Sequence, residues 1–171
     1  MSLTRLQPDI HVKSIYDINF DMLRQMSISC LILDIDNTLT PWNSTEISDE
    51  LSNWIQSALN NGFKICLLSN NGEKRVRELA DKLAVDYIFN AAKPRRHSYN
   101  LALKKMNEER QHAAVIGDQI LTDILGGKRA GMFTILVDPI GESEFIGTKI
   151  MRFIERLFFD RNSYKKGEMR Q

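Results

Sequence analysis

Short apolar runs alternate along the chain with stretches in which apolar residues recur at helical spacing. The runs are bounded by polar residues, which predicts buried strands, and the stretches between them predict amphipathic helices. We expect five strands, at Cys30–Leu33, Phe63–Leu68, Val85–Phe89, Ala113–Ile116 and Phe133–Val137. We expect helices between them, starting after Ser48 and at Gly72–Leu83, Pro94–Asn107 and Ile120–Ala130.

Strands separated by helices are typical of an α/β domain. We therefore predict a Rossmann-like, three-layer α/β fold with a five-stranded, mainly parallel sheet and helices on both faces. A length of 171 residues with 43% hydrophobic content fits one such domain. We expect residues 1–27 to form an N-terminal arm or short helix, residues 28–160 the domain, and residues 161–171 a flexible tail.

The charge balance and the cysteines exclude several classes of protein. Lysine and arginine total 23 and aspartate and glutamate total 22, so the net charge of +1 gives no support to nucleic-acid binding. The sequence shows no apolar run of about 20 residues and no signal-peptide pattern, so we expect a cytoplasmic protein. Cys30 and Cys66 lie inside apolar runs, which predicts buried thiols, and no zinc-ligand spacing is present.

Polar side chains follow four successive predicted strands. In open α/β sheets, ligands bind outside the carboxyl ends of the strands, so these side chains are expected at one edge of the sheet. In chain order they are Asp34, Asp36 and Thr38 after the first strand, Ser69 and Asn70 after the second, Lys93 after the third, and Asp118 and Asp123 after the fourth.

These residue types together predict a phosphate site with a metal ion. Asp34 and Asp36 are two positions apart and lie on one side of an extended chain. Carboxylates this close to Asp118 repel one another unless a cation offsets them, and oxygen ligands favour Mg²⁺. Lys93 adds a positive charge and Ser69 a hydroxyl, which suits a phosphoryl group. Taken alone, each of the aspartates and Ser69 has an ordinary structural alternative as a cap of a turn or helix.

The order of these groups resembles the four motifs of the haloacid dehalogenase superfamily of phosphohydrolases. The matching segments are Asp34-Ile35-Asp36-Asn37-Thr38-Leu39, Leu67-Leu68-Ser69-Asn70, Lys93-Pro94, and Gly117-Asp118 with Asp123. The resemblance covers about residues 28–137 and implies a phosphomonoester hydrolase of the capless IIIA type. Within the superfamily, the chain is similar to small bacterial phosphatases related to mitochondrial phosphatidylglycerophosphate phosphatases.

The resemblance implies a role for each site residue. Asp34 would attack phosphorus and become an aspartyl phosphate, while Asp36 would act as general acid and then general base. Ser69, Asn70 and Lys93 would hold the phosphoryl oxygens.

The resemblance also implies a Mg²⁺ cofactor and its ligands. Asp34, Asp118 and the main-chain carbonyl of Asp36 would hold the ion. Asp123 would orient Lys93 or a metal-bound water, and Thr38 would fix the loop.

Two other functions fit part of the pattern. A phosphoacceptor receiver domain also gathers acidic residues, a hydroxyl and a lysine around Mg²⁺, but its phosphoacceptor ends the third strand and its lysine comes last. Here Asp34 ends the first strand and Lys93 precedes Asp118, which disfavours that function. An inactive phosphate-binding scaffold is the other alternative, and the intact set of acidic residues argues against it.

The lengths of the connections leave no room for a cap domain after Leu39 or between Ser69 and Lys93. We therefore expect a site that is open to solvent or closed by another subunit of a homo-oligomer. An open site suits a phosphate on a large substrate, so we expect a lipid phosphate such as phosphatidylglycerophosphate, or a phosphoprotein. Residues 145–159 predict a terminal helix packed on the sheet, with an interfacial helix at the inner membrane surface as the alternative.

Overall fold

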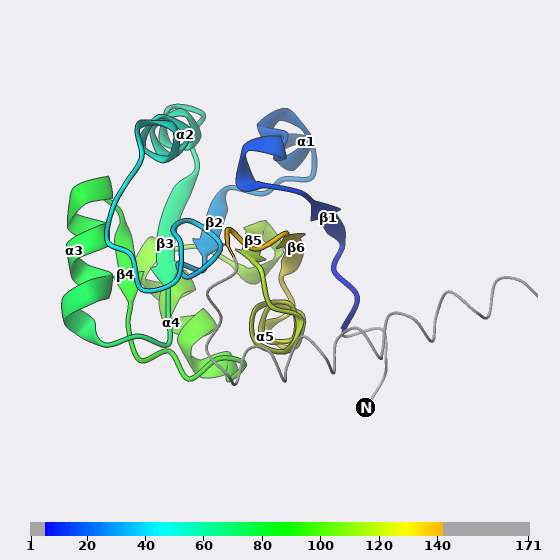
Figure 1. Cartoon of the computed structure of the whole chain (residues 1–171). Coiled ribbons are helices and arrows are strands. Elements are labelled where there is room, and N and C mark those ends of the chain that lie inside the picture. Colours follow the sequence, from blue (N-terminus) through cyan, green and yellow to red (C-terminus); the bar gives the residue numbers. More distant parts are fainter. Residues whose placement is uncertain (1–5, 142–171) are drawn as a thin grey trace, which may run out of the picture. The chain divides into compact units, whose positions relative to one another are not determined.

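The computed structural model describes residues 6–141, which form a six-stranded sheet in the order β1-β6-β5-β2-β3-β4 (Figure 1). Every neighbouring pair of strands is parallel. The strands are β1 (Ile10–Val12), β2 (Cys30–Leu33), β3 (Lys64–Leu68), β4 (Asp86–Ile88), β5 (Ala113–Gly117) and β6 (Phe133–Val137). The predicted α/β class with a parallel sheet is therefore confirmed.

Helices cover both faces of this sheet, with α1 and α2 on one side and α4 and α5 on the other (Figure 1). The helices are α1 (Phe20–Gln25), α2 (Asp49–Asn60), α3 (Glu73–Leu83), α4 (Arg96–Met106) and α5 (Leu125–Ala130). Three shorter turns are η2 (Ile15–Asp17), η3 (Arg110–His112) and the π-helical η4 (Ile120–Ile124). The stretch expected as one helix from Ile120 to Ala130 is thus divided between η4 and α5.

The two sides of the sheet form two separate apolar cores. In β2, Leu31 and Leu33 are buried with residues of α1, α2 and α3, whereas Cys30 and Ile32 are buried with residues of α4 and α5. This alternation follows from the period of a strand, in which successive side chains point to opposite faces. Cys30 and the other cysteine, Cys66, are buried free thiols, as expected.

The expected count of five strands is wrong by one edge strand. Residues Ile10–Val12, which we expected in an N-terminal arm, form β1 and pair with β6, with Ile10 opposite Ile135 and Val12 opposite Val137. Only two of its three residues are apolar, so its pattern is too short to separate from a loop. The following short helix, expected at 18–26, begins at Phe20 because the Asn19 side chain caps it by accepting a hydrogen bond from the Met22 amide.

The central strands place their carboxyl ends side by side. Leu33 at the end of β2 is level with Leu67 in β3 and with Ile116 in β5. The residues that follow these three strands therefore emerge at one edge of the sheet.

No helix among residues 6–141 is long and apolar enough to cross a membrane. The helix expected at residues 145–159 and the tail expected at 161–171 lie outside the described residues.

Candidate active site

A buried lysine joins two of the expected acidic residues. Lys93 Nζ donates hydrogen bonds to Asp34 Oδ1 at 2.5 Å and to Asp123 Oδ1 at 2.6 Å. The three side chains are 4%, 8% and 2% exposed, respectively. Burial alone would lower the pKa of Lys93, but the carboxylates of Asp123 and Asp34 outweigh it and raise the pKa above its usual value. The ammonium group therefore stays charged beside Asp34.

The carboxyl group of Asp34 is in an unfavourable place for a lone negative charge. Burial raises the pKa of Asp34 to about 7, an effect that Lys93 opposes and the nearby Asp123 carboxylate reinforces. A divalent cation at this position would favour the ionised form, because it adds positive charge next to the carboxylate. The local electrostatics thus suit a site that is completed by a metal ion.

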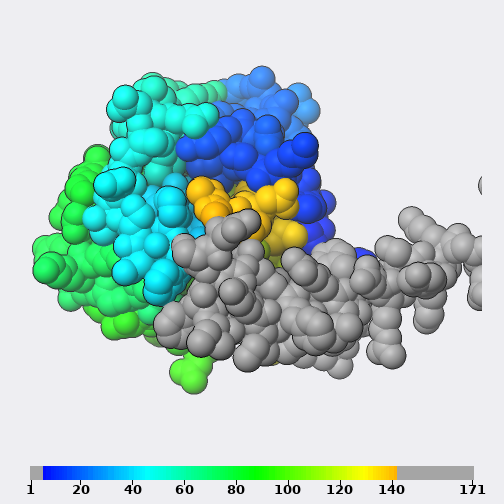
Figure 2. Space-filling view, in the orientation of Figure 1, coloured from blue at the N-terminus to red at the C-terminus, as the bar shows by residue number. Residues whose placement is uncertain are grey.

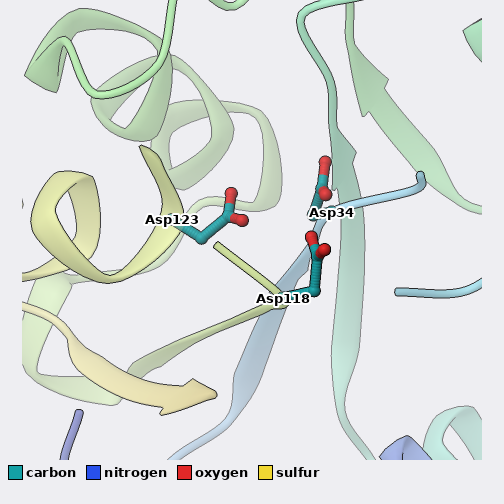
Figure 3. Close-up of side chains that lie close together, drawn as sticks. All are labelled: Asp34, Asp118 and Asp123. Carbon is teal, nitrogen blue, oxygen red and sulfur yellow. The ribbon is translucent and has the colours of Figure 1, made fainter. Parts of the chain in front are cut away.

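Three carboxylates converge at this point, as Figure 3 shows for Asp34, Asp118 and Asp123. One oxygen from each lies within 4.8 Å of the others, and all three residues are buried. Asp34 follows β2, Asp118 follows β5, and Asp123 belongs to η4. An all-oxygen set of this kind fits a hard divalent cation such as Mg²⁺. The cluster contains Asp123 as well as the expected carboxylate ligands Asp34 and Asp118.

A glycine makes room for Asp123. A Cβ atom at Gly117 would lie 2.4 Å from the carboxyl carbon of Asp123, which is so short that the Asp123 side chain would have to shift. Asp123 Oδ2 also accepts a hydrogen bond from the Gln119 amide at 3.3 Å, which ties η4 back to the end of β5. The close approach of Asp123 therefore explains why the Gly117-Asp118 motif has a glycine at its first position.

Asp36 is held by a different set of partners. Its carboxylate pairs with Arg75 of α3, with Arg75 Nη1 to Asp36 Oδ2 at 2.9 Å and Arg75 Nη2 to Asp36 Oδ1 at 2.7 Å. The Asn71 side chain donates to Asp36 Oδ2, and the Asn43 amide donates to Asp36 Oδ1 at 3.0 Å. The structure therefore separates the surroundings of Asp34 and Asp36, although they are two positions apart.

Sequence reasoning missed Arg75 and Asn71. In the sequence, Arg75 is one of several charged residues in a predicted amphipathic helix, and Asn71 belongs to the predicted turn before that helix. The adjacent Asn70-Asn71 pair after Ser69 was the one available signal, because asparagine side chains commonly bond to nearby groups in turns.

The backbone after β2 folds into a tight loop. Asn37 has a left-handed φ of 57°, and its amide donates to Thr40 O at 2.7 Å. The Leu39 amide donates to Ile35 O at 2.9 Å. Thr38 lies in this turn with 1% exposure, and its hydroxyl has no hydrogen-bond partner among the described residues.

Ser69 and Asn70 lie where the sequence placed them, at the end of β3. Ser69 is 1% exposed, and its hydroxyl oxygen accepts hydrogen bonds from the amide and the side chain of Asn71, both at 3.1 Å. Asn70 Oδ1 accepts a hydrogen bond from the Lys93 amide at 2.8 Å. Asn70 thereby fixes the loop that carries Lys93.

The loop of residues 39–48 contacts the site at Asp36, which accepts a hydrogen bond from the Asn43 amide. In Figure 2 this loop (cyan) borders the segment around Ile140 (orange), and the Ile140 amide donates to Asn37 O at 2.8 Å. Arg75 Nη2 donates to Ser44 O at 2.9 Å, which connects the loop to α3. A groove of about 420 Å³ runs along the loop and is lined in part by Leu39, Ser44 and Ile140.

Comparisons with known proteins agree with this geometry. A family described as haloacid dehalogenase-like hydrolase matches residues 31–92, and a family described as HAD-hydrolase-like matches residues 90–139. The probable phosphatase YqeG of Bacillus subtilis (strain 168) is 37% identical over 149 residues, which cover 87% of this chain and 87% of that protein.

Two more distant similarities extend the comparison. Phosphatidylglycerophosphate phosphatase 1, chloroplastic/mitochondrial, of Arabidopsis thaliana is 24% identical over 156 residues, which cover 85% of this chain and 45% of that protein. The cobalt-bound deoxy-D-mannose-octulosonate 8-phosphate phosphatase YrbI of Haemophilus influenzae shares the fold, with a TM-score of 0.53, 15% identity, and coverage of 66% of this chain and 69% of that chain. Because the identity to YqeG extends over most of both chains, this chain belongs to the haloacid dehalogenase-like hydrolases and is a phosphatase of that family.

Proposed function

We propose that the protein is a Mg²⁺-dependent phosphomonoester hydrolase that forms an aspartyl phosphate on Asp34. One observation carries the proposal: the Asp34 carboxylate lies 2.5 Å from the Lys93 ammonium and within 4.8 Å of the oxygens of Asp118 and Asp123. A nucleophilic carboxylate flanked by a fixed cation and a metal-binding cluster is what phosphoryl transfer through a covalent intermediate requires.

In the first step, an oxygen of Asp34 forms a bond to phosphorus while the bond from phosphorus to the leaving oxygen breaks. The electron pair of that bond stays on the leaving oxygen, which takes a proton from Asp36 and departs as an alcohol. Lys93 lies beside Asp34 and stabilises the negative charge on the phosphoryl oxygens. Ser69 and Asn70 help to hold the same oxygens.

In the second step, a water molecule attacks the phosphorus atom of the aspartyl phosphate. Asp36, now a carboxylate, takes a proton from this water, and the bond between phosphorus and Asp34 breaks. Phosphate leaves, Asp34 is again a carboxylate, and Asp36 is again protonated. This steady release of phosphate distinguishes the enzyme from a receiver domain, which would keep its phosphoaspartate.

The oxygen-only donor set fits Mg²⁺, which supplies charge neutralisation at the phosphoryl oxygens when bound. Asp34, Asp118 and the main-chain carbonyl of Asp36 are the ligands we propose. Asp123 contacts Lys93 and lies in the same cluster, so it would orient the lysine beside the bound ion.

For the substrate, we propose a lipid phosphate such as phosphatidylglycerophosphate. The connections among the described elements are short, with residues 34–48 between β2 and α2 and residues 69–72 between β3 and α3, so neither of these connections holds an inserted cap domain. The named activity of the Arabidopsis relative supports this substrate class by analogy. In this proposal the enzyme acts at a membrane surface, and a second subunit is the alternative way to cover the site.

The test measures phosphate release with Mg²⁺ and with a chelator. The substrates are phosphatidylglycerophosphate in mixed micelles, a phosphopeptide and a sugar phosphate. We expect activity only with the metal, the highest kcat/KM on the lipid, and a loss of several orders of magnitude in Asp34→Asn. Wild-type rates in Asp34→Asn would refute the mechanism, whereas a clear preference for the sugar phosphate or the phosphopeptide would refute only the substrate.

A further inference from the structure

Arg75 makes a two-point ion pair that fixes both oxygens of Asp36. The two nitrogen–oxygen distances are 2.9 and 2.7 Å, and the side chains of Arg75 and Asp36 are 15% and 17% exposed. Arg75 Nη2 also donates to Ser44 O at 2.9 Å, so the same guanidinium group connects Asp36, α3 and the loop of residues 39–48. A planar guanidinium bound to both carboxylate oxygens fixes direction as well as distance.

The other charged residues of α3 differ from Arg75. Arg77, two positions further along, is 61% exposed and lies 3.9 and 4.0 Å from Glu73 and Asp81 on its own helix. Ion pairs between exposed side chains contribute little to the stability of the fold. Arg75 is therefore distinguished from its neighbour by burial and by its contact with another part of the chain, and Arg77 provides a matched control.

Asp36 and Asp34 are directed to different partners. Asp34 contacts Lys93, while Asp36 is bonded to Arg75, Asn71 and the Asn43 amide. In-line displacement needs the nucleophile and the leaving oxygen on opposite sides of phosphorus. Arg75 bonds Asp36 to partners that Asp34 does not share, and such separate anchoring is what an acid acting on the leaving oxygen requires.

We propose that Arg75 is a positioning residue that holds Asp36 on the leaving-group side of the site and thereby decides how well the enzyme expels poor leaving groups. This inference rests on the proposed function. Four donors fill the lone-pair directions of the Asp36 carboxylate, two of them from Arg75. In the acid step, one of the neutral bonds, from Asn43 or Asn71, gives way to the proton that Asp36 passes to the leaving oxygen, while the N–H donors of Arg75 keep the carboxyl group in place.

The test compares substrates that depend differently on leaving-group protonation. p-Nitrophenyl phosphate releases a stable phenolate and needs little help, whereas propyl phosphate releases an alkoxide and needs the acid. We expect Arg75→Met to lower kcat/KM about 100-fold on propyl phosphate and less than about 5-fold on p-nitrophenyl phosphate. Arg77→Met should stay within about 2-fold of the wild type on both substrates.

Two further variants make the test specific to Asp36. Asp36→Asn should show the same contrast between the substrates, and adding Arg75→Met to it should cause no further loss, because residues that act as a unit are not additive. Arg75→Lys keeps the charge but loses the two-point geometry, so it should show a smaller contrast of the same sign. Thermal melting shows whether Arg75→Met folds. If it does not, Arg75→Lys tests the same role of Arg75.

Several outcomes would overturn the role of Arg75. An equal loss on both substrates would place Arg75 in phosphoryl binding or in folding, and additive losses in the double variant would separate it from Asp36. Wild-type kcat/KM of Arg75→Lys on both substrates would show that the two-point ion pair does not position Asp36. If Asp36→Asn shows the contrast and Arg75→Met does not, only this inference fails. If the wild type releases no phosphate from these two substrates or from phosphatidylglycerophosphate, the proposed function fails with it.

Discussion

Gly117 lies directly against the carboxyl group of Asp123, so that a Cβ atom at position 117 would come within 2.4 Å of the Asp123 carboxyl carbon. Asp123 in turn lies 2.6 Å from Lys93 Nζ. The absence of one methyl group at the end of β5 thus sets the position of a carboxylate and, through it, of the lysine beside Asp34. Packing at a single glycine is in this way connected to the chemistry of the site.

The first prediction is that Gly117→Ala lowers phosphatase activity by about 100-fold, because shifts of about 1 Å in a catalytic group have costs of this order. The methyl group pushes Asp123 aside and disturbs Lys93, while the fold is retained. Gly72→Ala is the control, since nothing lies within 4 Å of a Cβ atom there. Steady-state kinetics and thermal melting of both variants check this, and full activity in Gly117→Ala would show that Asp123 does not position Lys93.

The second prediction separates Asp36 from Asp118. The Asp36 carboxylate forms an ion pair with Arg75 and is not part of the carboxylate cluster. Asp36→Asn should therefore slow turnover at all Mg²⁺ concentrations without changing the concentration that gives half-maximal activity. Asp118 belongs to the carboxylate cluster, so Asp118→Ala should raise that Mg²⁺ concentration at least about 10-fold. Titration of activity with Mg²⁺ measures both effects. Equal metal affinities in the two variants would remove the Asp118 carboxylate from the metal site.

The parts of the fold that could be predicted are those with a strong local pattern. The five predicted strands and the groups that follow them were visible because buried strands are apolar runs and the site residues come directly after them. The strand β1 was not, because its pairing with β6 depends on residues more than 100 positions away and its own sequence has three residues. Tertiary pairing, not local preference, makes this segment a strand.

The same distinction applies to the site. Asp34, Lys93 and Asp118 could be placed by topology alone, because parallel strands bring their carboxyl ends to one edge. The partner of Asp36 could not, since Arg75 reaches it from the first turn of a helix and nothing in a helical pattern tells which charged residue turns inward. Contacts between a loop and a helix side chain depend on how the two pack, which no spacing in the sequence encodes.

The third prediction concerns the attachment of β1. The Asp9 carboxylate accepts hydrogen bonds from the Thr134 amide at 2.8 Å, the Thr134 hydroxyl at 3.0 Å and Lys128 Nζ at 2.5 Å. Burial raises the pKa of Asp9, but these hydrogen bonds outweigh it and hold the pKa below its usual value. Asp9→Asn should lower the free energy of unfolding by about 1 kcal/mol, because hydrogen bonds to a partly exposed charged group contribute about that much.

The sign of the pH dependence follows from the lowered pKa of Asp9. Its contribution to stability is present above the unfolded value of 3.8 and is lost as the pH falls through the folded pKa. The difference in the free energy of unfolding between wild type and Asp9→Asn should therefore be constant near neutral pH and shrink in acid. Urea unfolding at a series of pH values measures it, and a difference that grows in acid would contradict the assignment.

The last prediction uses Asp34 to reveal the metal site through stability. Without a metal ion, burial raises the pKa of Asp34 from 3.8 to about 7, so the folded protein holds a proton that the unfolded chain releases. Stability therefore falls as the pH rises from about 4 to about 7. Mg²⁺ binds the ionised carboxylate and removes this penalty, so it should raise the melting temperature more at pH 8 than at pH 5.

The expected gap is several degrees, since 1 kcal/mol shifts the melting temperature of a domain of this size by roughly 3 °C. Asp34→Asn should lack this fall in stability with pH and should gain less from Mg²⁺, because the variant has no proton to release at position 34 and one anionic ligand fewer. Thermal melts of wild type and variant, each with Mg²⁺ and with a chelator, separate these contributions. Equal stabilisation by Mg²⁺ at both pH values would mean that the ion does not bind next to Asp34, and the metal assignment would then have to move away from the end of β2.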